Sequence, residues 1–237
     1  MASTESPTAT TAAPEKVRRI VEAAARAMGR DGYAGTSMKD IAQEAGIAQG
    51  LIHYYFDSKE SLLLAVMHGM CGQMLEESRA RFGASTGDPL ARGWAGLEAA
   101  RDHCTQHPEL IRLLFEMVTV SLNNPAMRAE LESMYAEIEA TTAAMVRELN
   151  ALLPTEMPIP PEDFANVIIA GIDGLAMRAQ VDRSFDIEAA YRAFGFLLLS
   201  SAASAYAAAG QPLPLDALAN AIGAQVIVAP PGAVEPD

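Results

Sequence analysis

The sequence has few cysteines and no strand-like alternation of apolar and polar residues, and each shortage excludes a class of protein. Only two of the 237 residues are cysteine, so a disulfide framework is impossible and a reducing, cytoplasmic location is the simpler expectation. No stretch alternates apolar and polar residues over several positions, so strands are not expected. Because 50% of the residues are hydrophobic and 20% charged, with ordinary numbers of Pro and Gly, the chain should fold.

Motifs of enzymes and membrane proteins are also missing. The sequence has no G-x-S-x-G, Walker or dinucleotide-binding motif, so it predicts neither an enzyme nor a bound cofactor. His103 and His107, with Cys104 between them, have a spacing that zinc accepts, but no fourth ligand is evident and no metal site is predicted. The uncharged segment 193–215 has only a short apolar core, so no membrane association is expected.

Charge is distributed unevenly along the chain. The net charge of -13 would disfavour nucleic acid if it were uniform, because phosphate binding needs clustered Lys and Arg. Residues 15–62, however, carry as many basic as acidic side chains, whereas residues 63–237 carry ten Arg, no Lys and 22 acids. Any DNA-binding segment is therefore expected at the N-terminus.

Apolar residues follow helical spacing through most of the sequence and predict about nine helices. The first has a stripe at Val17, Ile20, Val21, Ala24 and Met28 and ends near Asp31-Gly32. Later helices are delimited by Gly46, by Gly83 and by prolines. A further short helix is expected near 215–222. The predicted N-terminal caps are Ser37 with Asp40, Asp57 with Glu60, Asp88 before Pro89, Asn124 before Pro125, and Asp186.

The segment 36–59 has the most informative pattern. A short helix, a turn with glycine and a second short helix make a helix-turn-helix, whose second helix fits the major groove of DNA. The order Thr-Ser before Ile-Ala, then Ala-Gly-Ile, Gly50, Tyr54-Tyr55-Phe56 and Lys59-Glu60-Ser61-Leu62 resembles the tetracycline-repressor (TetR) family of bacterial regulators. The resemblance covers residues 15–66.

This resemblance implies an all-α homodimer with two domains. An N-terminal three-helix DNA-binding domain with the helix-turn-helix would occupy 15–62, and a larger helical ligand-binding and dimerisation domain 63–225. Residues 1–14, which lack the regions of a signal peptide, would form a disordered tail, and 226–237 a second tail. By similarity, the positions that face DNA are Ser37, Met38, Lys39, Gln49, Gly50, Leu51, His53, Tyr54, Tyr55 and Lys59.

The chemistry of these residues suits DNA. Gln49 can pair with a base edge and Leu51 can touch a thymine methyl, while the Tyr hydroxyls and Lys59 can hold phosphates. Tyr54 and Tyr55 have the alternative of packing against the fourth helix. Lys59 could instead be solvated, although a cation at a helix start is unfavourable and suggests another partner. Ile52 and Phe56 are expected in the core.

The effector and dimer sites are less defined by the sequence. Flexible Met and large aromatic residues suit an apolar pocket, and they suit an ordinary core equally well; the candidates are Trp94, Phe115, Met117, Met145 and Met177. The acidic domain favours a neutral or cationic apolar effector unless Arg112, Arg147 or Arg178 points inward. The last helix is apolar almost all round, so it is either buried in its own subunit or covered by a second copy; the interface candidates are Gly171, Gly174, Phe194, Leu198 and Ala202.

The sequence therefore predicts a ligand-responsive transcriptional regulator. Its partners would be a double-stranded, palindromic DNA operator, a small apolar effector and a second copy of the chain. Repression released by the effector is the simplest mode, and activation stays open. The alternative is a helical protein that binds a small molecule or a partner without specific DNA binding.

Overall fold

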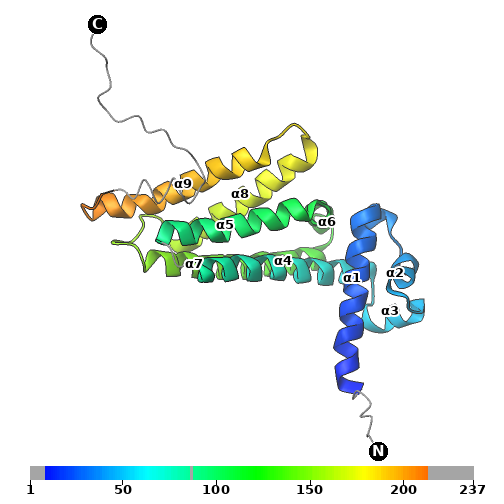
Figure 1. The fold of residues 1–237 in the computed structure, drawn as a ribbon. Coiled ribbons are helices and arrows are strands. Elements are labelled where there is room, and N and C mark those ends of the chain that lie inside the picture. The colour runs from blue at the N-terminus through cyan, green and yellow to red at the C-terminus, as the bar shows by residue number, and fades with distance from the viewer. Residues whose placement is uncertain (1–8, 86–87, 213–237) are drawn as a thin grey trace, which may run out of the picture. The chain divides into compact units, whose positions relative to one another are not determined.

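The structure, a computed structural model, describes residues 9–85 and 88–212, and it is all-helical in these ranges (Figure 1). The all-α prediction is confirmed. The short helix expected near 215–222 and the tail 226–237 lie outside the described residues. Within them the helices are α1 (Ala9–Gly35), α2 (Met38–Ala45), α3 (Gln49–Tyr55), α4 (Lys59–Ala84), α5 (Pro89–Gln106), α6 (Pro108–Ser121), α7 (Pro125–Asn150), α8 (Pro161–Val181) and α9 (Ile187–Ala208).

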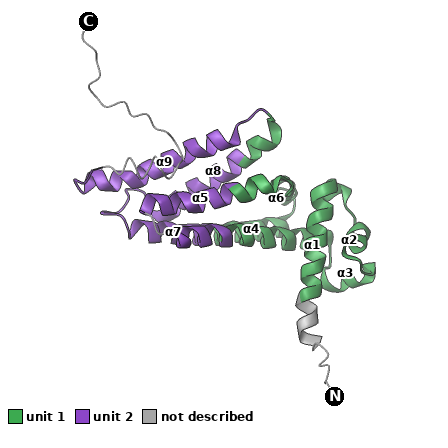
Figure 2. Ribbon diagram, viewed as in Figure 1, with its two compact units in different colours: residues 1–75, 102–138, 176–183 green, residues 76–101, 139–175, 184–237 purple. Residues whose placement is uncertain are grey.

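These helices group into two compact units, which Figure 2 colours separately. Unit 1 comprises residues 1–75, 102–138 and 176–183; unit 2 comprises 76–101, 139–175 and 184–237. The predicted boundary after residue 62 is not where the units divide. Unit 1 contains α6 as well as the first three helices, because α6 packs against α1.

Apolar side chains of the first three helices form much of the core of unit 1. The α1 stripe is buried at Ile20, Ala24 and Met28. Ile52 and Phe56 are buried too, as the sequence predicts. Burial of about 1.5–3 kcal/mol per large side chain makes this core the main source of stability for helices that are individually short.

Two glycines of unit 2 allow aromatic rings to lie directly on a helix backbone. A Cβ atom built on Gly195 of α9 would lie 2.1 Å from Cζ3 of Trp94 in α5. A Cβ built on Gly171 of α8 would lie 2.2 Å from Cζ of Phe194 in α9. Real Cβ atoms do not approach that closely, so any larger residue would force these helices apart.

Three of the predicted N-terminal caps are confirmed by their hydrogen bonds. Asp88 Oδ1 accepts from the N–H of Leu90 at 2.8 Å. Asn124 Oδ1 accepts from the N–H of Met127 at 3.1 Å, and Asp186 Oδ1 accepts from that of Ala189 at 2.9 Å. Each cap satisfies an N–H that the first turn of a helix leaves without an intrahelical partner.

The cap predicted at Asp57 is wrong by one residue. The Ser61 N–H donates to Ser58 Oγ at 3.1 Å, and the Ser58 N–H donates to Ser61 Oγ at 3.2 Å. The three-residue spacing of a capping box is thus met by Ser58 and Ser61 rather than by Asp57 and Glu60. Serine hydroxyls both donate and accept, so either serine can serve as the acceptor.

At the N-terminus, α1 begins earlier than expected. Composition predicts a disordered tail for residues 9–14, but they form the start of α1. Alanine is the strongest helix former, and three alanines, Ala9, Ala12 and Ala13, fall in this stretch. Residues 1–8, the rest of the predicted tail, lie outside the described residues.

One described helix, α8, is long and apolar enough to cross a membrane by length and composition alone. In the sequence, the segment that suggests a membrane span is the uncharged stretch 193–215 instead. Only 17% of the apolar window of α8 is buried within the chain. A helix that packs against a partner protein meets the same criteria.

The contact between α5 and α9 leads to a stability prediction. Gly195→Ala should lower the free energy of unfolding by about 1–3 kcal/mol, because the new methyl group overlaps the Trp94 ring. Gly72→Ala is the matched control: its Cβ meets nothing within 4 Å, and alanine should stabilise α4 by up to about 1 kcal/mol. Urea unfolding measures both, and equal stability of Gly195→Ala and the unaltered chain would contradict the packing.

Candidate nucleic-acid interface

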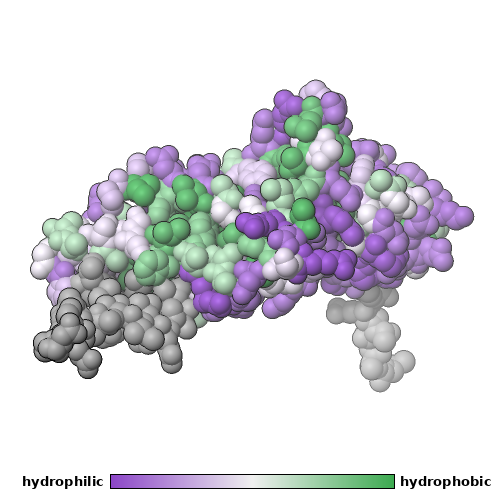
Figure 3. All heavy atoms as spheres, turned by 90° about the horizontal axis from the view of Figure 1, so that it is seen from above, coloured by the Kyte–Doolittle hydropathy of each residue, from purple (hydrophilic) through white to green (hydrophobic). Residues whose placement is uncertain are grey.

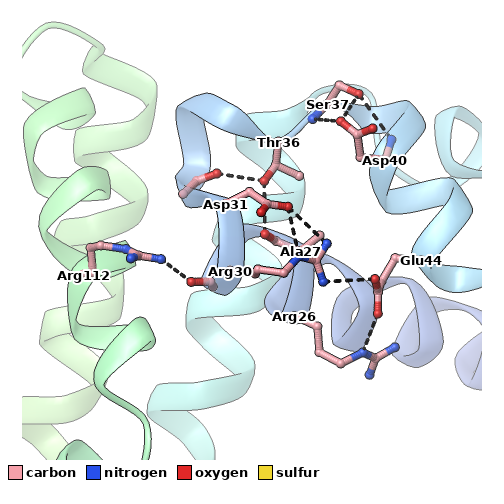
Figure 4. A network of polar contacts seen from close by, with 11 residues as sticks. Arg26, Ala27, Arg30, Asp31, Thr36, Ser37, Asp40, Glu44 and Arg112 are labelled. Atoms are coloured by element: carbon pink, nitrogen blue, oxygen red, sulfur yellow. Dashed lines mark hydrogen bonds and ion pairs between the residues drawn. The ribbon is translucent and has the colours of Figure 1, made fainter.

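α2 and α3 form a helix-turn-helix whose first helix is fixed at both ends. Ser37 Oγ accepts from the Asp40 N–H at 3.2 Å, and Asp40 Oδ2 accepts from the Ser37 N–H at 2.9 Å, which completes the predicted capping box (Figure 4). The Ser37 hydroxyl, which also donates to Asp40 Oδ2 at 2.6 Å, and then the Ser37 N–H hold the pKa of the Asp40 carboxyl below its ordinary value. Gly46 ends α2 in the left-handed region at φ 66°, where glycine carries no steric cost. The turn therefore sets α3 at a fixed angle to α2.

Basic residues of α1 are used within unit 1 to hold α2. Arg26 Nε lies 3.0 Å from Glu44 Oε1, and Arg30 Nη1 lies 3.4 Å from Glu44 Oε2. The Arg26 hydrogen bond, with Arg30 adding to it, lowers the pKa of Glu44. Arg19 donates to the Ala45 carbonyl at the end of α2 at 3.2 Å. Three of the seven basic residues in the segment 15–62 therefore bind α2 of the same chain.

The residues expected to face DNA come from α2, α3 and the start of α4. They fall into two groups by exposure. The exposed ones are Ser37, Lys39, Gln49, Gly50, His53 and Tyr54, and the half-buried ones are Met38, Leu51, Tyr55 and Lys59. Since Ile52 on the opposite side of α3 is fully buried, α3 presents one polar face to solvent while its other face lies in the core.

The two tyrosines of α3 differ in their surroundings. Tyr54 is 78% exposed, so packing against α4 does not account for it. Tyr55 is half-buried, and the two rings meet edge to face with centroids 5.0 Å apart. Tyr54 therefore has a hydroxyl that is accessible to a partner, and Tyr55 supports its ring.

Lys59 has a different environment from the one predicted. Its Nζ donates to the carbonyls of Tyr33 at 2.8 Å and Thr36 at 3.0 Å, and lies 4.2 Å from the centroid of the Tyr33 ring. All three contacts lie within the chain and account for a lysine at a helix start. Lys59 thus joins the start of α4 to the end of α1, and its role toward phosphate stays a prediction.

A glycine breaks α1 shortly before this junction. Gly32 has φ 78° and ψ 161° inside the helix, far from the helical ψ near -42°. The peptide after it is turned, so the Tyr33 N–H no longer points to the Gly29 carbonyl four residues earlier. The break leaves one donor and one acceptor without their helical partners.

α6 takes up both of these groups. The Tyr33 N–H donates to Glu116 Oε2 at 2.7 Å, and Arg112 Nη2 donates to the Gly29 carbonyl, the second contact being drawn in Figure 4. Arg112 and Glu116 are one turn apart on α6, with Nε and Oε1 4.0 Å apart. An ion pair of α6 therefore bridges the interrupted turn of α1.

The Tyr33 hydroxyl completes the junction. It donates to Glu60 Oε1 at 2.8 Å. This hydrogen bond is the main reason why the pKa of Glu60 is below its ordinary value, while burial, with Glu60 adding to it, raises the pKa of Tyr33 well above normal. Tyr33 is thus held through its N–H by α6 and through its carbonyl, ring and hydroxyl by α4.

The sequence pattern does not predict this junction. It predicts that α1 ends near Asp31-Gly32, and it indicates Arg112 only as a charge that could face an effector. The available signal was Arg112 with Glu116 at i and i+4. Nothing in the sequence, however, indicates that this pair meets α1.

The effector candidates are distributed over both units. Trp94 and Met145 belong to unit 2, whereas Phe115, Met117 and Met177 belong to unit 1. Trp94 and Met117 are buried, Phe115 and Met145 half-buried, and Met177 exposed. Of the arginines considered for an anionic effector, Arg112 is bound to α1 and Arg147 pairs with Glu162. The ligand assignments stay predictions.

The dimer candidates mostly face inward. Leu198 and Ala202 are buried, and Phe194 packs on Gly171 of the same unit, while Gly174 is exposed. The outer side of α9 instead exposes two large apolar residues, Phe196 at 41% and Leu197 at 68%. Val167 of α8 is also exposed, and apolar surface gathers over these helices in Figure 3.

His103 and His107 lie close enough for their rings to touch, with centroids 5.0 Å apart. Among the described residues, no group of three or more His, Cys, Asp or Glu has the geometry to hold a metal ion.

Comparison with known proteins gives two family matches. The family described as bacterial regulatory proteins, tetR family, matches residues 20–66, and the BetI-type transcriptional repressor C-terminal domain matches 89–200. The regulator BetI of Rhizobium meliloti is 38% identical over 166 residues, which are 69% of this chain and 78% of that protein. BetI of Agrobacterium fabrum is 34% identical over 168 residues, 70% and 77% of the two chains.

Solved structures share the fold. FadR of Bacillus subtilis in complex with stearoyl-CoA superposes with a TM-score of 0.65 at 18% identity, covering 78% of this chain and 98% of FadR. A transcriptional regulator of Saccharomonospora viridis in complex with choline has a TM-score of 0.61 at 24% identity, covering 76% and 93%.

The lowered carboxylate pKa values predict acid sensitivity of the helix-turn-helix. A depressed pKa stabilises the fold above the unfolded value, which is 4.5 for Glu60, and this contribution is lost as pH falls through the folded pKa. Tyr33→Phe removes the main cause of the Glu60 shift, so its free energy of unfolding should fall less steeply between pH 5 and pH 3, as chemical denaturation at each pH would measure.

Tyr54→Phe is the matched control, because it removes an exposed hydroxyl from the same part of the chain. It should keep the acid slope of the unaltered protein. Identical slopes for Tyr33→Phe and Tyr54→Phe would show that the Tyr33–Glu60 bond has no part in the acid response.

Proposed function

The chain belongs to the TetR family of bacterial regulators, and from that premise we propose that it is a homodimeric repressor which releases a palindromic operator when a small cationic molecule binds. Membership makes it a DNA-binding regulator that responds to a ligand. The finer proposal concerns repression, dimerisation, the residues that read DNA and the class of effector.

The exposed face of α3 is the observation that most supports DNA reading. Gln49, His53 and Tyr54 are exposed on a short helix whose other side is anchored by Ile52. Gln49 can make paired hydrogen bonds with adenine, and exposed Gly50 lets the backbone approach the groove. Lys39 and the Tyr54 hydroxyl are suited to phosphates.

Dimerisation is supported by the apolar residues that α8 and α9 leave exposed. Phe196, Leu197 and Val167 would be covered by the same residues of a second copy, and the small exposed Gly174 permits close approach. We therefore assign the interface to these three exposed apolar residues and Gly174. Leu198 and Ala202 are not part of it, because they already pack inside their own subunit. A symmetric dimer matches a palindromic operator.

The operator experiment tests this function directly. The protein should bind duplex DNA from its own upstream region tightly, with one dimer on the two half-sites of the operator. It should bind a scrambled duplex of equal length weakly. Gln49→Ala should cost about 1–3 kcal/mol on the operator and little on the scrambled duplex. Fluorescence anisotropy at two salt concentrations measures both.

Equal, weak binding to every duplex, including a genomic library, would contradict the proposal. It would favour a helical protein that binds a small molecule or partner without reading DNA. A Gln49→Ala loss of equal size on both duplexes would remove its base-reading role alone.

Charge and aromatic content support a cationic effector. The segment 63–237 is strongly acidic, which disfavours an anion such as an acyl-CoA, and Trp94 offers the ring that binds a quaternary ammonium best. The structural neighbour of Saccharomonospora viridis holds choline. We therefore propose choline or a similar small ammonium compound as the effector class.

Trp94 is the single tryptophan of the sequence, so its fluorescence reports on this site alone. Choline should change the emission and weaken the operator complex, whereas stearoyl-CoA should do neither. The neutral isostere 3,3-dimethylbutan-1-ol should bind about 3- to 30-fold more weakly, since it lacks the cation. Equal binding of choline and the isostere would exclude recognition of the charge.

A further inference from the structure

We propose that Arg112 and Glu116 of α6 are positioning residues for the DNA-reading helices, which they orient by bridging the interrupted turn of α1. The proposal rests on the proposed DNA-binding function. It assigns a role in operator binding to two residues that belong to neither α2 nor α3.

The bridge replaces one specific hydrogen bond. In an unbroken α1 the Tyr33 N–H would donate to the Gly29 carbonyl. With Gly32 at φ 78°, Glu116 accepts from that N–H and Arg112 donates to that carbonyl. If α6 were displaced, both backbone groups would lose their partners unless Gly32 returned to helical torsion angles and α1 straightened.

Straightening α1 would disturb α4 as well. The Gly32–Tyr33 peptide would have to turn, and Tyr33 would move relative to α4. Lys59 and Glu60 bind the carbonyl and hydroxyl of that same residue. The kinked form of α1 is therefore the one in which α6 and α4 are both attached to Tyr33.

The orientation of the helix-turn-helix follows from this kink. α2 begins directly after it, because Thr36 Oγ1 donates to the Gly32 carbonyl at 2.8 Å and Ser37 is the N-cap of α2. Arg30, just before the kink, holds Glu44 of α2. A change at Gly32 therefore alters the path of the chain from α1 into α2.

Neither residue of the bridge is suited to touch DNA itself. Glu116 is an anion and would repel phosphate, while the guanidinium of Arg112 is bound between the Gly29 carbonyl and Glu116. Other charged groups face the same turn from α1 and α6. Asp31 pairs with Arg30, and Glu109, whose Cγ would lie 3.0 Å from a Cβ on Gly29, pairs with His107.

Operator titrations of Glu116 variants test the proposal. Glu116→Ala leaves the Tyr33 N–H without its acceptor and should weaken operator binding by about 10- to 100-fold. Glu116→Gln keeps an acceptor oxygen and should stay within about threefold of the unaltered protein. Binding to scrambled DNA and the slope of log K against log salt should be unchanged in both, because no phosphate contact is lost.

Glu130→Ala is the charge-matched control, since Glu130 is an exposed glutamate of α7 in the same unit. It should bind the operator as the unaltered protein does. Full operator affinity of Glu116→Ala, an equal loss in Glu116→Gln, or an equal loss on scrambled DNA would overturn the positioning role. Circular dichroism excludes unfolding as the cause of a loss.

A second measurement is independent of DNA. Amide hydrogen exchange at Tyr33 should be faster in Glu116→Ala than in Glu116→Gln or Glu130→Ala, because the N–H has lost its acceptor. Equal protection in all three would overturn the proposal even without a known operator. If the unaltered protein binds no DNA specifically, the proposed function fails, and the exchange result alone decides whether the bridge exists.

Discussion

A single interrupted turn of α1 determines how the N-terminal helices are held. Gly32 adopts a positive φ that other residues rarely tolerate. It thereby exposes a backbone donor and acceptor that must find partners in a partly buried place. Arg112 and Glu116 supply those partners from α6, and Lys59 and Glu60 bind the neighbouring Tyr33 from α4. The orientation of α2 and α3 therefore depends on side chains far away in the sequence.

The elements of the fold follow from local rules that can be read in the sequence. The capping box at Ser37, the left-handed Gly46 and the cap at Asp186 each concern a few consecutive residues, and each is observed. The helical spacing of apolar residues, together with capping residues, glycines and prolines at the helix ends, thus predicts the helices. The cap at Ser58 lies one residue from the predicted one, and α1 starts fewer than two turns earlier than expected, because helix ends are set by weak local preferences.

The tertiary contacts could not be predicted in the same way. Lys59 and Glu116 look like ordinary surface charges until α1, α4 and α6 are placed together. The same holds for Gly195, whose lack of a side chain matters only because Trp94 lies against it. Burial of Leu198 and exposure of Leu197 on a helix that is apolar all round also depend on which side meets α5 and α8. These distinctions are properties of packing, which a single sequence does not encode locally.

Because α4 and α6 act on the same residue, their effects on operator binding should not be independent. A double-mutant cycle of Lys59→Met and Glu116→Ala tests this most directly, with operator affinity as the readout. If Tyr33 is one junction, the double variant should lose little more affinity than the more damaging single variant. Losses that add in full, with a coupling free energy near zero, would mean that α4 and α6 hold the reading helices separately and would contradict the account.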